Sequence, residues 1–138
     1  MATVAEIKHR LSAAIYAQKR LERNIERLKV LRSQVERITP IVSDMPKGGG
    51  ELDRRGKLLA ELIDISREYE VSCVEQQRII LDVQRLIDTA SKDMWRAILE
   101  DFYIDGLNWQ QIADKEGYSY SYVTNAHGEA LLELAKNN

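Results

Sequence analysis

The chain has 138 residues, of which 44% are hydrophobic and 30% charged, and its formal net charge is −2. This is the composition of a folded protein and excludes a disordered one. No run approaches about 18 uninterrupted apolar residues, so we expect no membrane-spanning segment. Charged residues interrupt positions 1–15, so we expect no secretion signal. The single cysteine, Cys73, cannot form an internal disulfide, which favours a reducing cytoplasm and the role of a small core residue.

The charge is distributed unevenly along the chain. Residues 1–39 carry nine Lys and Arg against four Asp and Glu, a net +5. Residues 40–92 carry eight against ten, a net −2, and residues 93–138 carry three against eight, a net −5. An interface with nucleic acid formed by the C-terminal segment alone would therefore lack the positive charge that supplies most phosphate affinity.

Two long segments have the three-and-four spacing of apolar residues that is typical of a coiled-coil seam. In residues 4–39 the seam positions are Val4, Ile7, Leu11, Ala14, Gln18, Leu21, Ile25, Leu28, Arg32 and Val35. In residues 51–91 they are Leu52, Leu59, Leu62, Tyr69, Cys73, Gln76, Ile80, Val83, Ile87 and Ala90. Further apolar positions outside both seams indicate a homodimer through the long helices; the alternative is a monomeric, self-contained hairpin.

Residues 40–50 are expected to form the loop between these helices. Pro40 lacks an N–H and should end the first helix, and three consecutive glycines at 48–50 oppose an early restart. The loop therefore predicts an antiparallel hairpin over residues 1–91. A phosphate-binding loop is not indicated, because the spacing of that motif is absent.

Residues 92–138 predict three shorter helices: 92–104, 109–116, and one from Ser119 or Ser121 to about 135. Glycines at 106 and 117 are placed for left-handed caps, and Asn108 for an N-cap. The predicted fold is thus all-α: a long antiparallel helical hairpin (1–91), then a helix-turn-helix domain (92–138).

The helix-turn-helix prediction depends on the pattern within residues 109–128. Ile112 and Val123 suit the shared core of two steeply crossing helices, and Ala113 suits their close approach. Gly117 suits a turn that needs positive φ. Ala126 returns to the core one turn after Val123. Glu116 departs from the pattern, because an apolar residue is expected before the glycine.

The chain resembles a known family in several motifs. The segment 103–113 (YIDGLNWQQIA), together with Gly117-Tyr118-Ser119 and Ala130-Leu131, resembles region 4 of bacterial sigma factors. It resembles more closely the C-terminal region of ArpU-type phage regulators of late transcription. Residues 43–49 resemble a loop typical of streptococcal and related phage members. The resemblance implies a phage or prophage protein of the bacterial cytoplasm and nucleoid. Such a protein activates the late operon for packaging and structural proteins, acting on double-stranded DNA beside RNA polymerase.

The resemblance also implies which residues contact DNA. The positions that would reach base edges or the adjoining backbone from the third helix are Tyr120, Ser121, Tyr122, Thr124 and Asn125. The chemistry agrees, because Asn pairs with adenine and Thr or Tyr can contact a thymine methyl group.

Three further residues are expected at phosphates. Gln110 and Gln111 begin the second helix, where backbone N–H groups favour anions. His127 would add charge if it were protonated.

The third predicted helix, which would contact the bases, lacks the arginines that are usual in region 4. Three explanations stay open: basic arms with Arg20, Arg23, Arg27 and Lys29 assist; the domain binds only beside polymerase; or the fold is a protein-binding module.

Other functions are weaker predictions. A small terminase subunit would also join a helix-turn-helix to oligomerising helices, and a coiled-coil adaptor would need no DNA contact. The two histidines, His9 and His127, have no cysteine partner at metal spacing, so no metal or other cofactor is expected. No pair of carboxylates is marked for acid–base work, and an enzyme is not expected.

Overall fold

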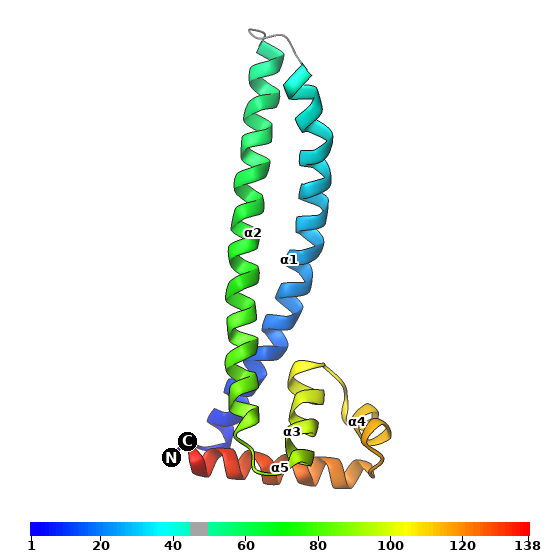
Figure 1. Cartoon of the computed structure of the whole chain (residues 1–138). Helices are drawn as coiled ribbons and strands as arrows, with labels where there is room; N and C mark the ends of the chain where they lie inside the picture. Colours follow the sequence, from blue (N-terminus) through cyan, green and yellow to red (C-terminus); the bar gives the residue numbers. More distant parts are fainter. Residues whose placement is uncertain (45–49) are drawn as a thin grey trace. The chain divides into compact units, whose positions relative to one another are not determined.

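The computed structural model describes residues 1–44 and 50–138, and every regular element in this part of the chain is helical (Figure 1). The elements are α1 (Val4–Asp44), α2 (Gly50–Asp88), α3 (Asp93–Leu99), the π-helical segment η1 (Glu100–Ile104), α4 (Trp109–Glu116) and α5 (Tyr120–Asn137). The prediction of an all-α fold, with a hairpin of two long helices followed by shorter ones, is confirmed.

The end of the first helix was predicted wrongly. α1 continues to Asp44 with Pro40 inside it. Proline has a helical φ, so a helix can continue through it, at the cost of one hydrogen bond and of crowding at the carbonyl four residues earlier. The neighbouring Thr39 hydroxyl donates to the carbonyl of Val35 over 2.6 Å. The helix α2 already begins at Gly50, so the predicted loop 40–50 is shorter than expected. Residues 45–49, which hold most of the motif at 43–49, lie outside the described part of the chain, as do the side chains of Ser43, Asp44 and Leu52.

Contacts between Cα atoms divide the chain into two compact units: Met1–Lys19 with Gln77–Asn138, and Arg20–Gln76. Each long helix contributes a segment to each unit. This division differs from the predicted boundary after residue 91, because the C-terminal helices share a core with the first turns of α1 and the last turns of α2.

The unit Arg20–Gln76 contains two antiparallel helical segments. The side chain of Asn24 donates to the Ser72 hydroxyl over 2.8 Å, and Arg27 donates to the Tyr69 hydroxyl over 3.1 Å. Asn24 is buried, whereas its neighbour Ile25 is 41% exposed. The buried seam position in this turn of α1 is therefore Asn24 and not Ile25, the position that the sequence pattern predicted. A buried amide is tolerated at this position because it has a hydrogen-bond partner.

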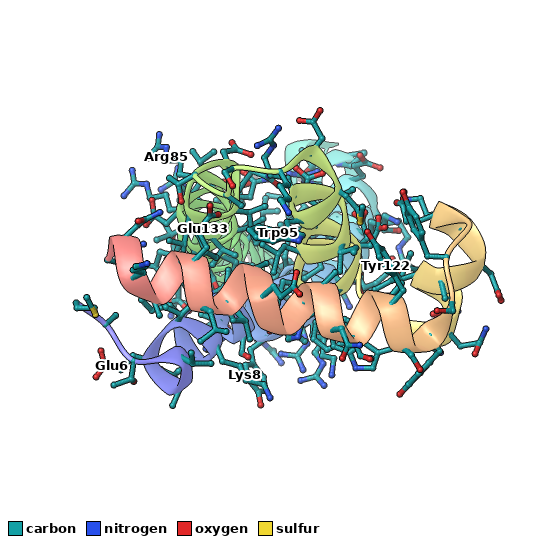
Figure 2. All side chains as sticks on the ribbon, turned by 90° about the horizontal axis from the view of Figure 1, so that it is seen from below. Glu6, Lys8, Arg85, Trp95, Tyr122 and Glu133 are labelled. Carbon is teal, nitrogen blue, oxygen red and sulfur yellow. The ribbon has the colours of Figure 1, made fainter. Side chains whose placement is uncertain are left out.

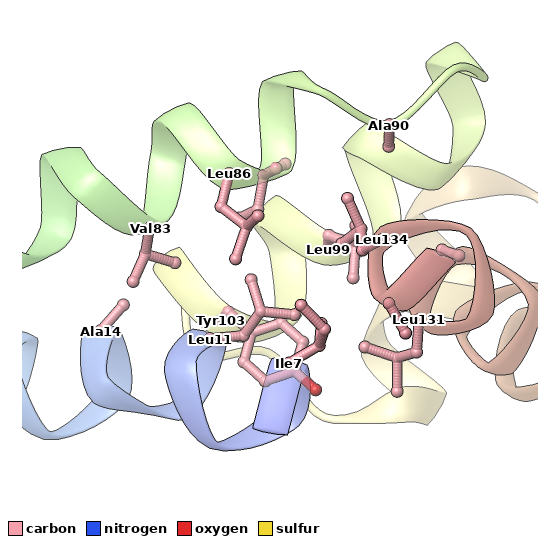
Figure 3. Packing of buried hydrophobic residues seen from close by; sticks show 13 residues of the cluster. Ile7, Leu11, Ala14, Val83, Leu86, Ala90, Leu99, Tyr103, Leu131 and Leu134 are labelled. Atoms are coloured by element: carbon pink, nitrogen blue, oxygen red, sulfur yellow. The ribbon is translucent and has the colours of Figure 1, made fainter. Parts of the chain in front are cut away.

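The larger unit has its main core where four helical segments and η1 meet (Figure 3). Its buried members are Ile7, Leu11, Ala14, Val83, Leu86, Ile87, Ala90, Leu99, Tyr103, Ala130, Leu131, Leu134 and Ala135. Burying one such aliphatic side chain contributes about 1.5–3 kcal/mol. The C-terminal half of α5 is therefore held against α1 and α2 by hydrophobic packing.

A second, smaller core lies within the helix-turn-helix. Ile98, Ile112, Ala113, Val123 and Ala126 are its buried members, which confirms the core positions predicted from residues 109–128. Phe102 of η1 stacks on Trp109 of α4 with ring centroids 4.0 Å apart. The predicted helix 92–104 is therefore an α-helix that changes to π-helical geometry at Glu100.

The caps of α4 and α5 follow the sequence prediction. Asn108 and Gln111 form a capping box, and Ser119 caps α5 by accepting from the Tyr122 N–H over 3.1 Å. Gly106 and Gly117 adopt φ of 72° and 76°. Among residues 1–44 and 50–138, no helix combines the length and the apolar character needed to cross a membrane.

Two glycines give a paired test of these backbone conformations. Neither Gly117 nor Gly128 has an atom within 4 Å of an added Cβ. Gly117→Ala should lower the free energy of unfolding by about 1 kcal/mol, because a Cβ is disfavoured at positive φ. Gly128→Ala lies inside α5 and should raise it by about 0.5–1 kcal/mol. Urea unfolding of both variants measures the two shifts. Shifts of the same sign would contradict the described turn.

Candidate nucleic-acid interface

The helix α5 presents one face to the core and one to the surface. Val123 is completely buried and Ala126 is 5% exposed, so both fix the rotation of the first turns. Tyr120, Ser121 and Asn125 lie on the other side and are exposed. α5 packs on both α3 and α4 (Figure 1). The structure therefore brings these three sequence-predicted residues together on one exposed helical face.

Thr124 lies at the edge of this face and is half-buried. Its hydroxyl donates back to the carbonyls of Tyr120 and Ser121, over 3.2 and 3.1 Å. The hydroxyl is thus already bonded within the helix, which leaves the methyl group as the natural contact for a ligand.

The three tyrosines around the start of α5 are all partly exposed. Tyr118, Tyr120 and Tyr122 are 42%, 51% and 42% exposed. Tyr118 and Tyr122 stack on each other with centroids 4.6 Å apart. The Tyr122 hydroxyl donates to the sulfur of Met94 on α3 over 3.0 Å. Figure 2 shows Tyr122 on the side of α5 that faces α3 and α4. Tyr122 is therefore tied to its own domain. Neither Tyr118 nor Tyr120 has a hydroxyl hydrogen bond among the described contacts, and of these two only Tyr118 stacks on Tyr122.

The two glutamines at the start of α4 are exposed but already engaged. The side chain of Gln111 accepts from the Asn108 N–H over 2.9 Å, and its own N–H donates to the Asn108 side chain over 2.8 Å. Gln110 donates to the Asp114 carboxylate over 3.0 Å. A phosphate at this helix end would meet Asp114 as well as Gln110, which weakens the predicted contact.

His127 does not reach the surface, so the structure argues against the predicted phosphate contact. It is 8% exposed, and its Nε2 lies 2.8 Å from the hydroxyl of Tyr103. Burial, followed by the nearby charge of Lys8, lowers the pKa of His127 to about 4. Burial also raises the pKa of Tyr103 to about 12. Both groups are neutral at pH 7, so His127 is an uncharged polar member of the core.

Glu116, the departure from the sequence pattern, is explained by a buried acid on η1. Asp101 is 3% exposed, and its Oδ1 accepts from Lys115 over 2.6 Å. Its Oδ2 is buried without a hydrogen-bond partner among the described groups. Hydrogen bonding with Asp101, followed by burial, raises the pKa of the Glu116 carboxyl. The protonated form of Glu116 is therefore favoured beside Asp101, and the acid before the glycine lies where α4 meets η1.

This acid pair was missed at the sequence level, where no carboxylate pair stood out. Asp101 and Glu116 are separated by a turn and a helix, and Asp101 is buried within the π-helical segment η1. The signals available were the unexpected Glu116 and its basic neighbour Lys115. Lys115 already bonds one oxygen of Asp101, so we assign the cluster a structural role.

The surface of the helix-turn-helix has little positive charge. In residues 93–138, all of which the structure describes, the basic side chains besides His127 are Arg96, Lys115 and Lys136. Arg96 pairs with Asp93 and the carbonyl of Ala90, and Lys115 pairs with Asp101. Lys136 lies in the last turn of α5. No cation therefore lies on the first turns of α5, where bases would be read.

No group of three or more His, Cys, Asp or Glu in residues 1–44 and 50–138 is placed to hold a metal ion.

The chain matches the model of one protein family over residues 37–135, more than half of its length. That family is described as "Protein of unknown function (DUF1492)", and the chain belongs to it. No curated protein and no solved structure matches the chain.

The buried His127 predicts an acid-sensitive core. The unfolded chain binds a proton near pH 6.5, but the folded chain binds it only near pH 4. Stability is therefore full above about pH 6.5 and falls as the pH drops toward 4, by about 2–3 kcal/mol from this group. His127→Gln keeps a polar partner for Tyr103 but cannot titrate. Urea unfolding at pH 7 and pH 4.5 should show a smaller acid loss in this variant than in the wild type. Equal losses of stability in the variant and the wild type would contradict the assignment of this acid sensitivity to His127.

Proposed function

We propose that this member of the DUF1492 family is a transcriptional regulator that reads double-stranded DNA with helix α5. One observation carries the proposal. A helix capped by Ser119 follows a left-handed turn at Gly117, buries Val123 and Ala126, and presents Tyr120, Ser121 and Asn125 outward. This is the arrangement in which the second helix of a helix-turn-helix enters the major groove.

The exposed groups suit base edges better than phosphates. The amide of Asn125 can pair with N6 and N7 of adenine, and the ring of Tyr120 and the methyl group of Thr124 can contact a thymine methyl group. Ser121 can donate to or accept from either kind of base pair. We therefore propose Asn125 as the main discriminating residue, with Tyr120, Ser121 and Thr124 beside it.

The finer part of the proposal rests on the resemblance to ArpU-type regulators and to sigma region 4. We propose a phage or prophage protein of the bacterial cytoplasm that activates late genes beside RNA polymerase. The lack of cations on the first turns of α5 supports a requirement for polymerase or another source of positive charge. Base contacts alone give weak binding when few phosphates are neutralised. The proposal includes no catalytic step.

A protein-interaction module is the second candidate. The net charge of −5 on residues 93–138 and the partly exposed Tyr118, Tyr120 and Tyr122 favour it, since tyrosines are common in protein interfaces. This candidate predicts that changes at Asn125 leave DNA affinity untouched. A packaging subunit, in contrast, predicts a ring of many copies.

Binding to DNA from the late promoter of the encoding phage, against scrambled DNA, tests the proposal. Asn125→Ala should reduce the preference for the promoter by roughly tenfold, because one bidentate base contact supplies about 1–3 kcal/mol of discrimination. Asn137→Ala, the same change at the far end of α5, is the matched control and should leave the preference unchanged.

Light scattering on the same samples gives the mass. Promoter preference by a monomer or dimer, lost only in Asn125→Ala, supports the regulator. A large ring without promoter preference would replace it with the packaging subunit. A monomer or dimer with no promoter preference, even when RNA polymerase is added, would favour the protein-interaction module.

A further inference from the structure

The unit Arg20–Gln76 contains a groove that the helix-turn-helix does not involve. Its volume is about 430 Å³. α1 contributes one wall, with Arg20, Arg23 and Arg27. The floor is polar, because Asn24 and Ser72 are joined there by a 2.8 Å hydrogen bond. The groove thus combines three guanidinium groups with a polar base.

The three arginines are available to a ligand. All are exposed, and none of them forms an ion pair with an acid in the described part of the chain. Arg27 is oriented by Tyr69, whose hydroxyl accepts its hydrogen bond over 3.1 Å and whose ring centroid lies 5.7 Å from the guanidinium carbon. Two other basic side chains of the unit are paired: Lys29 with Glu26, and Arg32 with Glu70.

The opposite wall contributes one carboxylate. Glu68 of α2 lines the groove beside Ile65 and Tyr69. One acid against three arginines leaves an excess of two positive charges in the lining. Arginine donates in a planar fork that matches the oxygens of a phosphate, and it is the usual residue for such contacts.

We infer that this groove binds the phosphodiester backbone of nucleic acid. The positions 20, 23 and 27 extend over about 10 Å of helix axis, a length in which one strand of duplex DNA presents about three phosphates. The contact is independent of base sequence, because it involves phosphates alone. The inference rests on the proposed function only in taking duplex DNA as the ligand.

Charge-matched variants test the inference with a scrambled, fluorescently labelled duplex across a salt series. The triple variant Arg20→Gln, Arg23→Gln, Arg27→Gln should lower affinity at least about tenfold and reduce the salt slope by about three, roughly one per phosphate contact. The control triple Arg37→Gln, Arg54→Gln, Lys57→Gln removes the same charge from the same unit and should change both quantities much less. Glu68→Gln should raise the affinity severalfold, because it removes the one carboxylate of the lining. Circular dichroism confirms that the variants remain helical.

Each outcome decides the inference. Equal losses in the two triple variants would show an effect of net charge alone and overturn it, and so would an unchanged affinity in Glu68→Gln. Binding of inorganic pyrophosphate without binding of the duplex would assign the groove to a small free phosphate and also overturn it. The promoter preference tested at Asn125 is a ratio of affinities and does not depend on the groove. A failure here is therefore distinguishable from a failure of the proposed function.

Discussion

The structure of the larger unit depends on one helix that belongs to two cores. The first turns of α5 bury Val123 and Ala126 against α3 and α4, and its later turns bury Leu131 and Leu134 against α1 and α2. His127 lies between these two sets and bonds to Tyr103. Because a helix is stiff over this length, the exposed face of α5 is fixed by packing on both sides of it. The helix-turn-helix is therefore not an appendage joined by a linker but part of the hairpin's own core.

The same packing explains the unusual electrostatics of the domain. His127 and Lys115 are the basic groups nearest the reading helix, and both have internal partners. His127 is neutral because the core excludes water, and Lys115 neutralises an acid that η1 turns inward. The two side chains that could have contacted phosphates, His127 and Lys115, thus connect α4, η1 and α5 instead. A surface that remains acidic repels nucleic acid at long range and disfavours non-specific binding.

The sequence predicts the parts of the fold that depend on local rules. The caps at Asn108 and Gly117 and the core at Ile112 and Val123 follow from side-chain chemistry and helical period, and all were predicted. Features that depend on tertiary contacts were not. Pro40 looks like a helix end when its missing N–H is considered alone. His127 looks like a surface cation until Tyr103, from a different helical segment, is placed beside it. The same limit applies to Asp101, which is buried in a π-helical segment that no simple period indicates.

For the candidate site, sequence reasoning predicted the helix and its exposed residues but not the state of each side chain. Gln111 and Tyr122 have their polar groups engaged within the domain, whereas Ser121 and Asn125 do not share such bonds among the described contacts. The number of groups left for base reading is small, and none is charged. Under the proposed function, affinity and selectivity would then come from different places: neutral polar groups on α5 discriminate between bases, and arginines on the hairpin hold the backbone. Such a division would let an overall acidic protein bind DNA selectively, because phosphate contacts carry no sequence information and a few neutral base contacts neutralise no phosphates.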